Sequence, residues 1–375
     1  MGDVSLVILS QDYLSASSCP MRLSSLNSLT VAILSASAYA SSGDRSQEFI
    51  KCVDFCKVAR CGPHFWNNSS LALRVTGWSC TDDCKYECMH EITNGEMQSG
   101  KRIQQYHGKW PFWRLAGMQE PASVAFSFLN LWAHAQGASK IREKVPESHP
   151  MRSYYLVWSI ISINAWIWSS VFHTRGIGLL FIFKIRSVSH QIVDLPITEK
   201  LDYFSAASTI LYALYYTIIR LFHFYPPPPS RLTLATNTWM RNLLTYACLL
   251  IYLAHVSYLT FLPRFDYTYN IAFNLVVGFT HNALWGLYAL PASLSLFRRF
   301  PSRPKKYRPR FVNKAVVFLT LTTAATSLEL FDFPPWARII DAHSLWHLST
   351  APLALKWYDY LVEDSLDPSW REQKT

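Results

Sequence analysis

Charged side chains are scarce in this chain of 375 residues. Asp, Glu, Lys and Arg together make up 16% of it, whereas about 25% is typical of soluble domains. This scarcity argues against an ordinary soluble domain and indicates a membrane protein. The formal net charge of +10 does not come from one polar face, as a nucleic-acid-binding surface would require, because the basic residues fall between apolar segments. We therefore expect no nucleic-acid partner.

Cysteines are crowded into residues 52–88, but no two of them form a C-x-x-C pair and their spacing matches no zinc finger. An even number of crowded cysteines is typical of a disulfide framework in an exported segment, so we predict three bridges, whose pairing stays open. A zinc finger is the alternative. Asn67 and Asn68 begin overlapping glycosylation sequons, which also indicate a lumenal compartment. Six of the eight cysteines lie in this one segment: Cys52, Cys56, Cys61, Cys80, Cys84 and Cys88.

The N-terminal region has the parts of a secretory signal peptide at residues 21–40: a basic start, an apolar middle and a small-residue cleavage site. Residues 1–20 match no targeting pattern, and we interpret them as a gene-model extension. Residues 41–121 are predicted to be a lumenal cysteine-rich segment. It ends in an aromatic run at 104–114, which we interpret as a collar at the lumenal membrane surface, because rings with polar tips prefer that interface.

Seven apolar stretches follow, most of them near the ~20 residues that cross a bilayer. They predict an all-α membrane protein with a bundle of seven transmembrane helices over residues 122–361, followed by a cytosolic tail at 362–375. The predicted stretches are 122–136, 154–172, 203–222, 242–262, 269–296, 312–330 and 345–361.

Lysine and arginine cluster in alternate loops between these stretches. The clusters follow the first, third and fifth stretches, at about 140–152, 220–241 and 298–314. Basic short loops stay in the cytosol, so these three loops are predicted to be cytosolic. The disulfide and glycosylation signals independently place the N-terminal segment in the lumen, and counting crossings from there gives the same orientation.

Five polar side chains are predicted to meet at the lumenal ends of these stretches: Ser169, His173, Asp202, His343 and His347. The last two are four residues apart, so on a helix they share a face and could grip one metal ion. Ionisable groups in apolar membrane helices are costly and usually have a chemical task. The simpler alternatives are hydrogen-bonded helix histidines, a helix N-terminal charge for the aspartate and a backbone-bonded serine. Asp341 either caps the last helix or orients a histidine.

Several motifs together resemble the GPI-anchor lipid-remodelling family, called post-GPI-attachment-to-proteins factor three in animals and present in fungi, within the CREST superfamily of seven-helix membrane hydrolases. The resemblance rests on the six-cysteine segment and on residues 105–112, 164–175, 201–204 and 341–347. It implies an enzyme of the endoplasmic reticulum (ER) membrane that removes an acyl chain from the lipid of GPI-anchored proteins, in a phospholipase A2-type step.

The same resemblance implies a zinc ion held by His173, His343 and His347, which activates a water molecule. Asp202 would orient that water and accept its proton, and Ser169 would hydrogen-bond the reacting oxygen. A competing mechanism uses Ser169 as nucleophile with a histidine base and an aspartate. We favour zinc, because the triad leaves His343 and His347 without a clear task.

Two other functions stay open. One is a ceramidase-like amide hydrolase that uses the same zinc site, and the other is a non-enzymatic seven-helix receptor or export chaperone for GPI-anchored proteins. The chain also departs from the family pattern, in which Thr174-Arg175 runs directly into an aspartate, because residues 176–193 intervene here. We hypothesise that this insert is a translated intron, which the transcript sequence would decide.

Overall fold

The computed structural model describes residues 41–63, 65, 69–175, 195–225 and 235–372, which are mostly helical. The predicted all-α class is confirmed for these residues, since their only β-type pairings are three isolated bridges. The predicted extension and signal peptide, the sequon residues Asn67 and Asn68, and the insert at 176–193 lie outside the described residues.

Seven long helices correspond one to one with the seven apolar stretches. By length and composition, three of them could cross a membrane, at Arg152–Thr174, Ile197–Leu221 and Thr238–Phe261. The prediction of seven spans is therefore confirmed only in part: the described residues contain the seven helices, but only three qualify as spans. The seven helices are α6 (Pro121–Lys144), α7 (Arg152–Thr174), α9 (Leu195–Leu221), α10 (Ala235–Phe261), α11 (Tyr267–Ala289), α12 (Val312–Leu330) and α13 (Ala342–Ser365).

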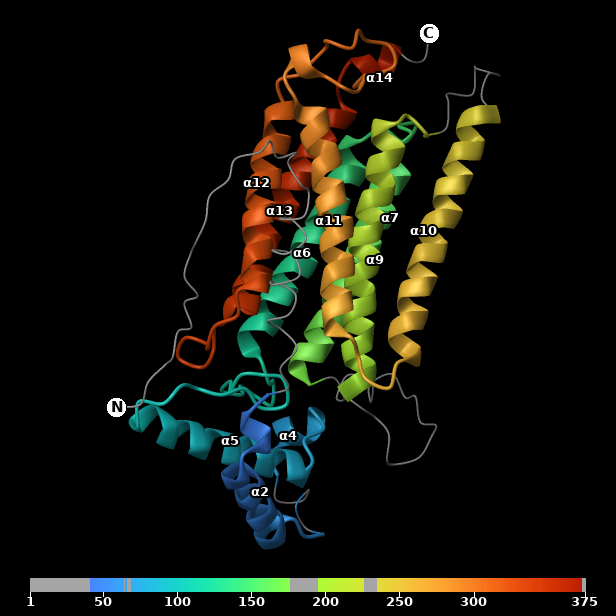
Figure 1. Cartoon of the computed structure of the whole chain (residues 1–375). Coiled ribbons are helices and arrows are strands. Elements are labelled where there is room, and N and C mark those ends of the chain that lie inside the picture. The colour runs from blue at the N-terminus through green and yellow to red at the C-terminus, as the bar shows by residue number, and fades with distance from the viewer. Residues whose placement is uncertain (1–40, 64, 66–68, 176–194, 226–234, 373–375) are drawn as a thin grey trace, which may run out of the picture. The chain divides into compact units, whose positions relative to one another are not determined.

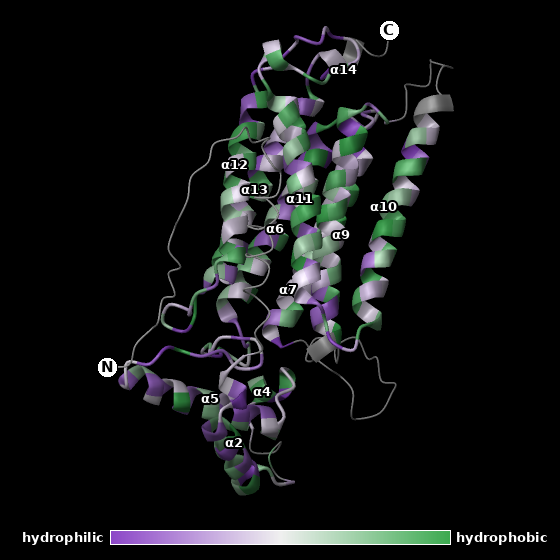
Figure 2. Ribbon diagram, viewed as in Figure 1, coloured by the Kyte–Doolittle hydropathy of each residue, from purple (hydrophilic) through white to green (hydrophobic). Residues whose placement is uncertain are grey.

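Six of these helices pack in a closed ring, in the order α6, α7, α9, α11, α12, α13 and back to α6, while α10 packs on α9 outside the ring (Figure 1). Apolar residues cover much of α10 (Figure 2), and its Leu243, Leu250 and Leu253 are exposed. An exposed apolar helix face of this kind needs an apolar environment such as lipid. Helix α10 thus adds to the membrane character of the protein.

Local sequence signals set the helix ends that matter for the site. Asp341 is the N-cap of α13, and its side chain and that of Ser344 form a reciprocal capping box. Of the two roles predicted for Asp341, the structure therefore shows the cap. Helix α11 ends at Ala289, before the predicted limit of 296, because Pro291 disfavours a helical conformation for the residue before it and removes a backbone donor.

A buried ion pair joins the C-terminal ends of α9 and α13, at the end of the ring away from the Asp341 cap. Arg220 donates Nε and Nη2 to the two carboxylate oxygens of Asp364, each at 2.7 Å, and both side chains are fully buried. Helix α13 continues to Ser365, so residues 362–365 belong to the bundle although we assigned them to the tail. The short helices η2 (Ala292–Leu294) and α14 (Ser369–Glu372) also follow helices of this bundle in sequence.

The cysteine-rich segment contains η1 (Gly43–Arg45), α2 (Gln47–Arg60), α4 (Leu71–Val75) and α5 (Cys80–Gln98). The three predicted disulfides are confirmed, and they join α2 and its C-cap to α5. The zinc-finger alternative is wrong, because all six thiols are used in the bridges. The pairs are Cys52–Cys88, Cys56–Cys84 and Cys61–Cys80.

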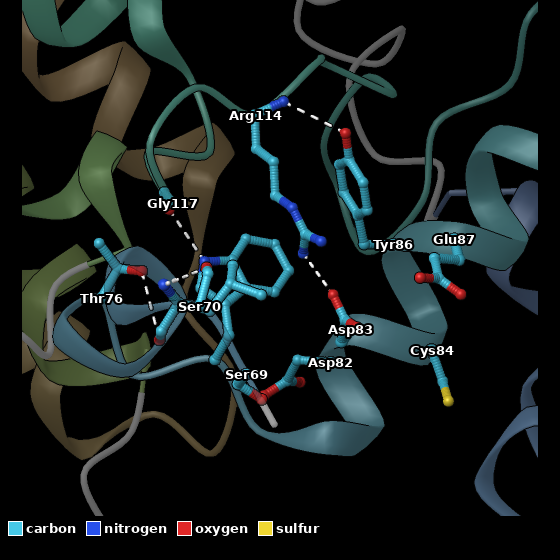
Figure 3. A network of polar contacts seen from close by, with 12 residues as sticks. Ser69, Ser70, Thr76, Asp82, Asp83, Cys84, Tyr86, Glu87, Arg114 and Gly117 are labelled. Carbon is cyan, nitrogen blue, oxygen red and sulfur yellow. Dashed lines mark hydrogen bonds and ion pairs between the residues drawn. The ribbon is translucent and has the colours of Figure 1, made fainter. Parts of the chain in front are cut away.

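The aromatic run 104–114 is anchored on α5 through Arg114 (Figure 3). The Arg114 guanidinium lies 2.6 Å from the carboxylate of Asp83, and its backbone N–H donates to the Tyr86 hydroxyl at 3.3 Å. Just beyond the run, the Trp78 indole N–H donates to the carbonyl of Gly117 at 2.9 Å. The predicted collar is therefore fastened to the cysteine-rich segment.

Candidate metal centre

The three histidines predicted as metal ligands come together. His173 is the penultimate residue of α7, and His343 and His347 lie one turn apart at the start of α13. The Nε2 atom of His343 is 3.3 Å from Nε2 of His173 and 3.0 Å from Nε2 of His347. One ring nitrogen from each histidine lies within 4.8 Å of the others. All three rings thus direct the same nitrogen toward one point.

Each histidine uses its other nitrogen, Nδ1, for a hydrogen bond that points away from this centre. Glu120 accepts from His173 at 2.8 Å, and Glu329 accepts from His343 at 2.7 Å. A carboxylate at Nδ1 fixes the proton there, so the Nε2 lone pair is free to face inward.

Helix α6 supplies the hydrogen-bond partner of the third ligand. The Nδ1 atom of His347 is 3.0 Å from the hydroxyl oxygen of Ser127, which is itself 2.9 Å from that of Ser169. A hydroxyl can accept from the imidazole N–H and donate onward to its neighbour, so Ser127 is able to hold His347 in the tautomer that a ligand requires.

This arrangement fits a bound cation. Nε2 atoms only 3.0 and 3.3 Å apart cannot all carry protons, because two N–H groups do not point at each other. In two of the three rings the carboxylate at Nδ1 favours the proton on that nitrogen. The Nε2 lone pairs that this tautomer directs to the centre are the donors that a cation needs. Three neutral imidazoles are a donor set that suits zinc and leaves a fourth position open.

Two of the three histidines are buried, and the third is partly exposed. His173 and His347 are 3% and 1% exposed, whereas the side chains of His343 and its partner Glu329 are 33% and 32% exposed. A small reactant could therefore approach from the side of His343, while the other two ligands stay protected from water.

Local sequence explains the position of Glu120, which sequence reasoning missed. Glu120 directly precedes Pro121, the first residue of α6, and its backbone N–H donates to the carbonyl of His173 at 3.1 Å. Its carboxylate also forms an ion pair with Lys109. Burial acts to raise the pKa of Glu120, but the positive charge of Lys109 outweighs it and helps to hold this pKa well below its usual range, so the carboxylate stays ionised.

Glu329 and Ser127 were also missed. Glu329 is the only acidic residue of α12 and lies in its last turn. That was a usable signal, since a carboxylate within an apolar stretch usually has a task. Ser127 offered no such signal, because serines in helices are ordinary and usually bond to their own backbone.

The two predicted catalytic residues lie differently with respect to the centre. Asp202, near the start of α9, interacts electrostatically with both His173 and His343. The hydroxyl of Ser169 contacts Ser127, behind the Nδ1 side of His347, and not the Nε2 side on which the three rings meet. The structure thus brings Asp202 into the electrostatic environment of the centre and gives Ser169 an indirect link to it.

Comparison with known proteins identifies the family of the chain. The model of the Per1-like family matches residues 70–181 and 180–365. The chain belongs to the Per1-like family. Both histidine-bearing helices lie within the matched residues, and the two matched segments meet inside the predicted insert at 176–193.

Several curated relatives of this Per1-like chain match it over most of its length. A Xenopus laevis protein named GPI-specific phospholipase A2-like PGAP3 is 38% identical over 87% of this chain and 91% of its own. The human protein of that name is 36% identical over 88% of this chain and 91% of its own length. The Protein PER1 homolog of Schizosaccharomyces pombe is 37% identical over 86% of this chain and 87% of its own length. No solved structure shows a significant match.

Proposed function

We propose that this chain is a zinc-dependent hydrolase of the ER membrane that removes an acyl chain from the lipid of GPI-anchored proteins. The observation that carries the proposal is the meeting of three imidazole Nε2 atoms, two of them backed by carboxylates at Nδ1. The substrate class is supported by relatives that are named GPI-specific phospholipase A2-like.

His173, His343 and His347 would hold the zinc ion, and Glu120, Glu329 and Ser127 would orient their rings. A zinc ion bound by three histidines supplies a Lewis acid and an activated water at neutral pH.

Asp202 serves as the proton carrier in this proposal. Its carboxylate lies in the electrostatic environment of His173 and His343, and we assign to it the acceptance of the proton of the attacking water and its delivery to the leaving alkoxide of the ester. Water adds to the acyl carbonyl, the acyl C–O bond breaks, and a fatty acid and a lyso-GPI are formed.

The competing serine mechanism is less well supported by the contacts. A serine nucleophile needs a histidine base within hydrogen-bond reach. The hydroxyl of Ser169 instead contacts Ser127, while each histidine Nδ1 is engaged with another group. We therefore assign Ser169 to the support of His347 through Ser127 and not to nucleophilic attack.

The proposed orientation places the histidine centre at the lumenal leaflet. The centre lies at the end of the ring that contacts the disulfide-bonded segment: Trp113 of the aromatic run donates its backbone N–H to the carbonyl of Arg338, just before α13. Disulfides form in an oxidising compartment such as the ER lumen. GPI-anchored proteins carry their lipid in the same leaflet, so substrate and site would meet there.

Lipid analysis of cells that lack their own family member tests this function. We expect such cells to accumulate unremodelled GPI lipid and to recover remodelled lipid when this chain is expressed. Expression of the chain with and without residues 176–193, as a matched pair, compares the two forms in the same assay. Accumulation of ceramide with unchanged GPI lipid would instead favour the ceramidase-like alternative. Mass spectrometry of both lipid classes in the same extracts distinguishes the two outcomes.

A further inference from the structure

The loop that leads into the ligand-bearing helix α13 is fastened to the cysteine-rich segment. Arg338, in the loop between α12 and α13, is 5% exposed and donates to Nδ1 of His90 at 2.8 Å and to the side-chain oxygen of Asn94 at 2.7 Å, both on α5. Its backbone carbonyl accepts from the N–H of Trp113 at 2.9 Å. The first proposed metal ligand of α13, His343, follows this arginine by five residues, which include the N-cap Asp341.

His90 is suited to receive this arginine because it is neutral. Burial, together with the charges of Arg338 and Arg114, lowers the pKa of His90 to about 4, although the hydrogen bond to Phe112 opposes the shift. Its Nε2 donates to the carbonyl of Phe112 at 3.0 Å, so Nδ1 is left as an acceptor at neutral pH. A buried guanidinium is costly without partners. Besides His90 and Asn94, Arg338 contacts the Met97 sulfur at 3.1 Å and lies over the Trp113 ring.

A second contact holds the other end of the same loop. Asp332, two residues beyond α12, accepts from the side-chain amide of Gln105 at 2.6 Å and from the indole N–H of Trp110 at 2.7 Å. Both donors belong to the aromatic run 104–114, which Arg114 anchors on α5. Glu329, the partner of His343, lies in the last turn of α12, three residues before Asp332.

The end of α7 is attached to the same segment. Arg175, the C-cap residue two positions after His173, lies 2.7 Å from the carboxylate of Asp82 on α5, and its guanidinium lies 4.1 Å from the centroid of the Trp78 ring. Lys109 of the aromatic run pairs with Glu120, the partner of His173. The end of α7 and the loop that leads into α13 are therefore both bonded to the cysteine-rich segment and its aromatic run.

We propose that the cysteine-rich segment is a structural part of the metal centre, which it preorganises by holding the end of α7 and the loop before α13 in register. The inference rests on the proposed zinc site and adds to it the residues that join the cysteine-rich segment to the parts of the bundle next to the site: Arg338, Asp82, Trp110 and Lys109. The three disulfides between α2 and α5 make this support rigid. Loss of one attachment leaves the ligands in place but less well aligned, and outer partners of metal ligands typically contribute 10-fold to 100-fold to affinity.

Zinc titration of the purified full-length chain, in competition with a chelator of known affinity, tests the inference. We expect Arg338→Ala and Asp82→Asn each to weaken zinc binding by about 10-fold to 100-fold. Arg102→Ala is the matched control, because Arg102 is an exposed arginine of the same segment, and we expect it to bind zinc as the unchanged chain does. Trp110→Phe removes only one indole donor, so it replaces Arg338→Ala as the test variant if Arg338→Ala does not fold.

Two further readouts separate positioning from general damage. The hydrolase activity of Arg338→Ala should return toward that of the unchanged chain at saturating zinc, whereas a merely destabilised protein would not recover. Hydrogen exchange in the metal-free protein should be faster over residues 331–347 in Arg338→Ala than in Arg102→Ala.

The outcomes also distinguish this inference from the proposed function. An unchanged chain that binds no zinc contradicts the proposed function. An unchanged chain that binds zinc, with Arg338→Ala, Asp82→Asn and Trp110→Phe binding it equally tightly, overturns the role of the cysteine-rich segment and leaves the zinc site standing.

Discussion

Replacing His343 by alanine is expected to remove bound zinc and to lower GPI lipid hydrolysis by more than about 100-fold, the upper end of what outer partners of a ligand contribute. The physical reason is that His343 lies between the other two ligands, with its Nε2 within 3.3 Å of both of theirs. Its loss leaves two ligands on different helices, which is one fewer than catalytic zinc sites use. The metal content and the rate of purified protein measure the effect.

The matched control is His107→Ala. His107 is half exposed and pairs with Asp44 in the cysteine-rich segment, away from the three ligands. We expect this variant to keep both zinc and activity. If His343→Ala retained stoichiometric zinc and full activity, the three histidines could not be the metal centre, and the metal and the reaction would have to be assigned to other residues.

Asp202→Asn is expected to lower kcat by about 10²-fold to 10⁴-fold while zinc remains bound, as is typical for loss of a general acid–base. An amide keeps the shape of the side chain but cannot accept the proton of the attacking water. The carboxylate is not among the groups that hold the histidine rings, so the metal site should persist. Steady-state rates together with metal analysis of the same preparation measure both effects.

Glu199→Gln is the control for this variant. Glu199 lies on the same helix three residues before Asp202, and it accepts a hydrogen bond from Tyr267 and not from a histidine. We expect its rate to stay close to that of the unchanged chain. A normal kcat for Asp202→Asn would remove this aspartate from the mechanism, and a loss of zinc would make it a structural residue.

The sequence was sufficient to bring the three histidines to one end of the bundle, because helix periodicity is a local property. Their role as zinc ligands was implied by the resemblance to the family. The spacing of His343 and His347 places them on one face, and the apolar stretches place the end of the second helix beside the start of the last. The orientation argument then brought His173 to the same end. None of these steps required knowledge of side-chain packing.

The partners of the ligands could not be predicted in the same way. Glu120 reaches His173 only because the backbone before α6 bonds to the end of α7, and Arg338 reaches His90 across 248 residues of sequence. Contacts of this kind depend on how loops close. We interpreted the aromatic run mainly as an interfacial collar, whereas Lys109, Trp110 and Trp113 bond to groups beside the centre.

The disulfide pairing was more predictable than we judged. Cys52 and Cys56 are four residues apart, as are Cys80, Cys84 and Cys88, so each set lies on one face of a helix. Two antiparallel helices with such faces join as a ladder, in which the first cysteine of one helix meets the last of the other. The structure has this order, with Cys52 bonded to Cys88 and Cys56 to Cys84.

The most direct test of metal-dependent hydrolysis is a reaction of the purified full-length chain with a defined GPI lipid in detergent or vesicles. We expect release of one fatty acid and one lyso-GPI for each lipid consumed, loss of the reaction after zinc is removed by a chelator, and recovery when zinc is restored. A chain that hydrolyses the lipid equally well without metal, or that binds zinc and releases no fatty acid, would contradict the mechanism.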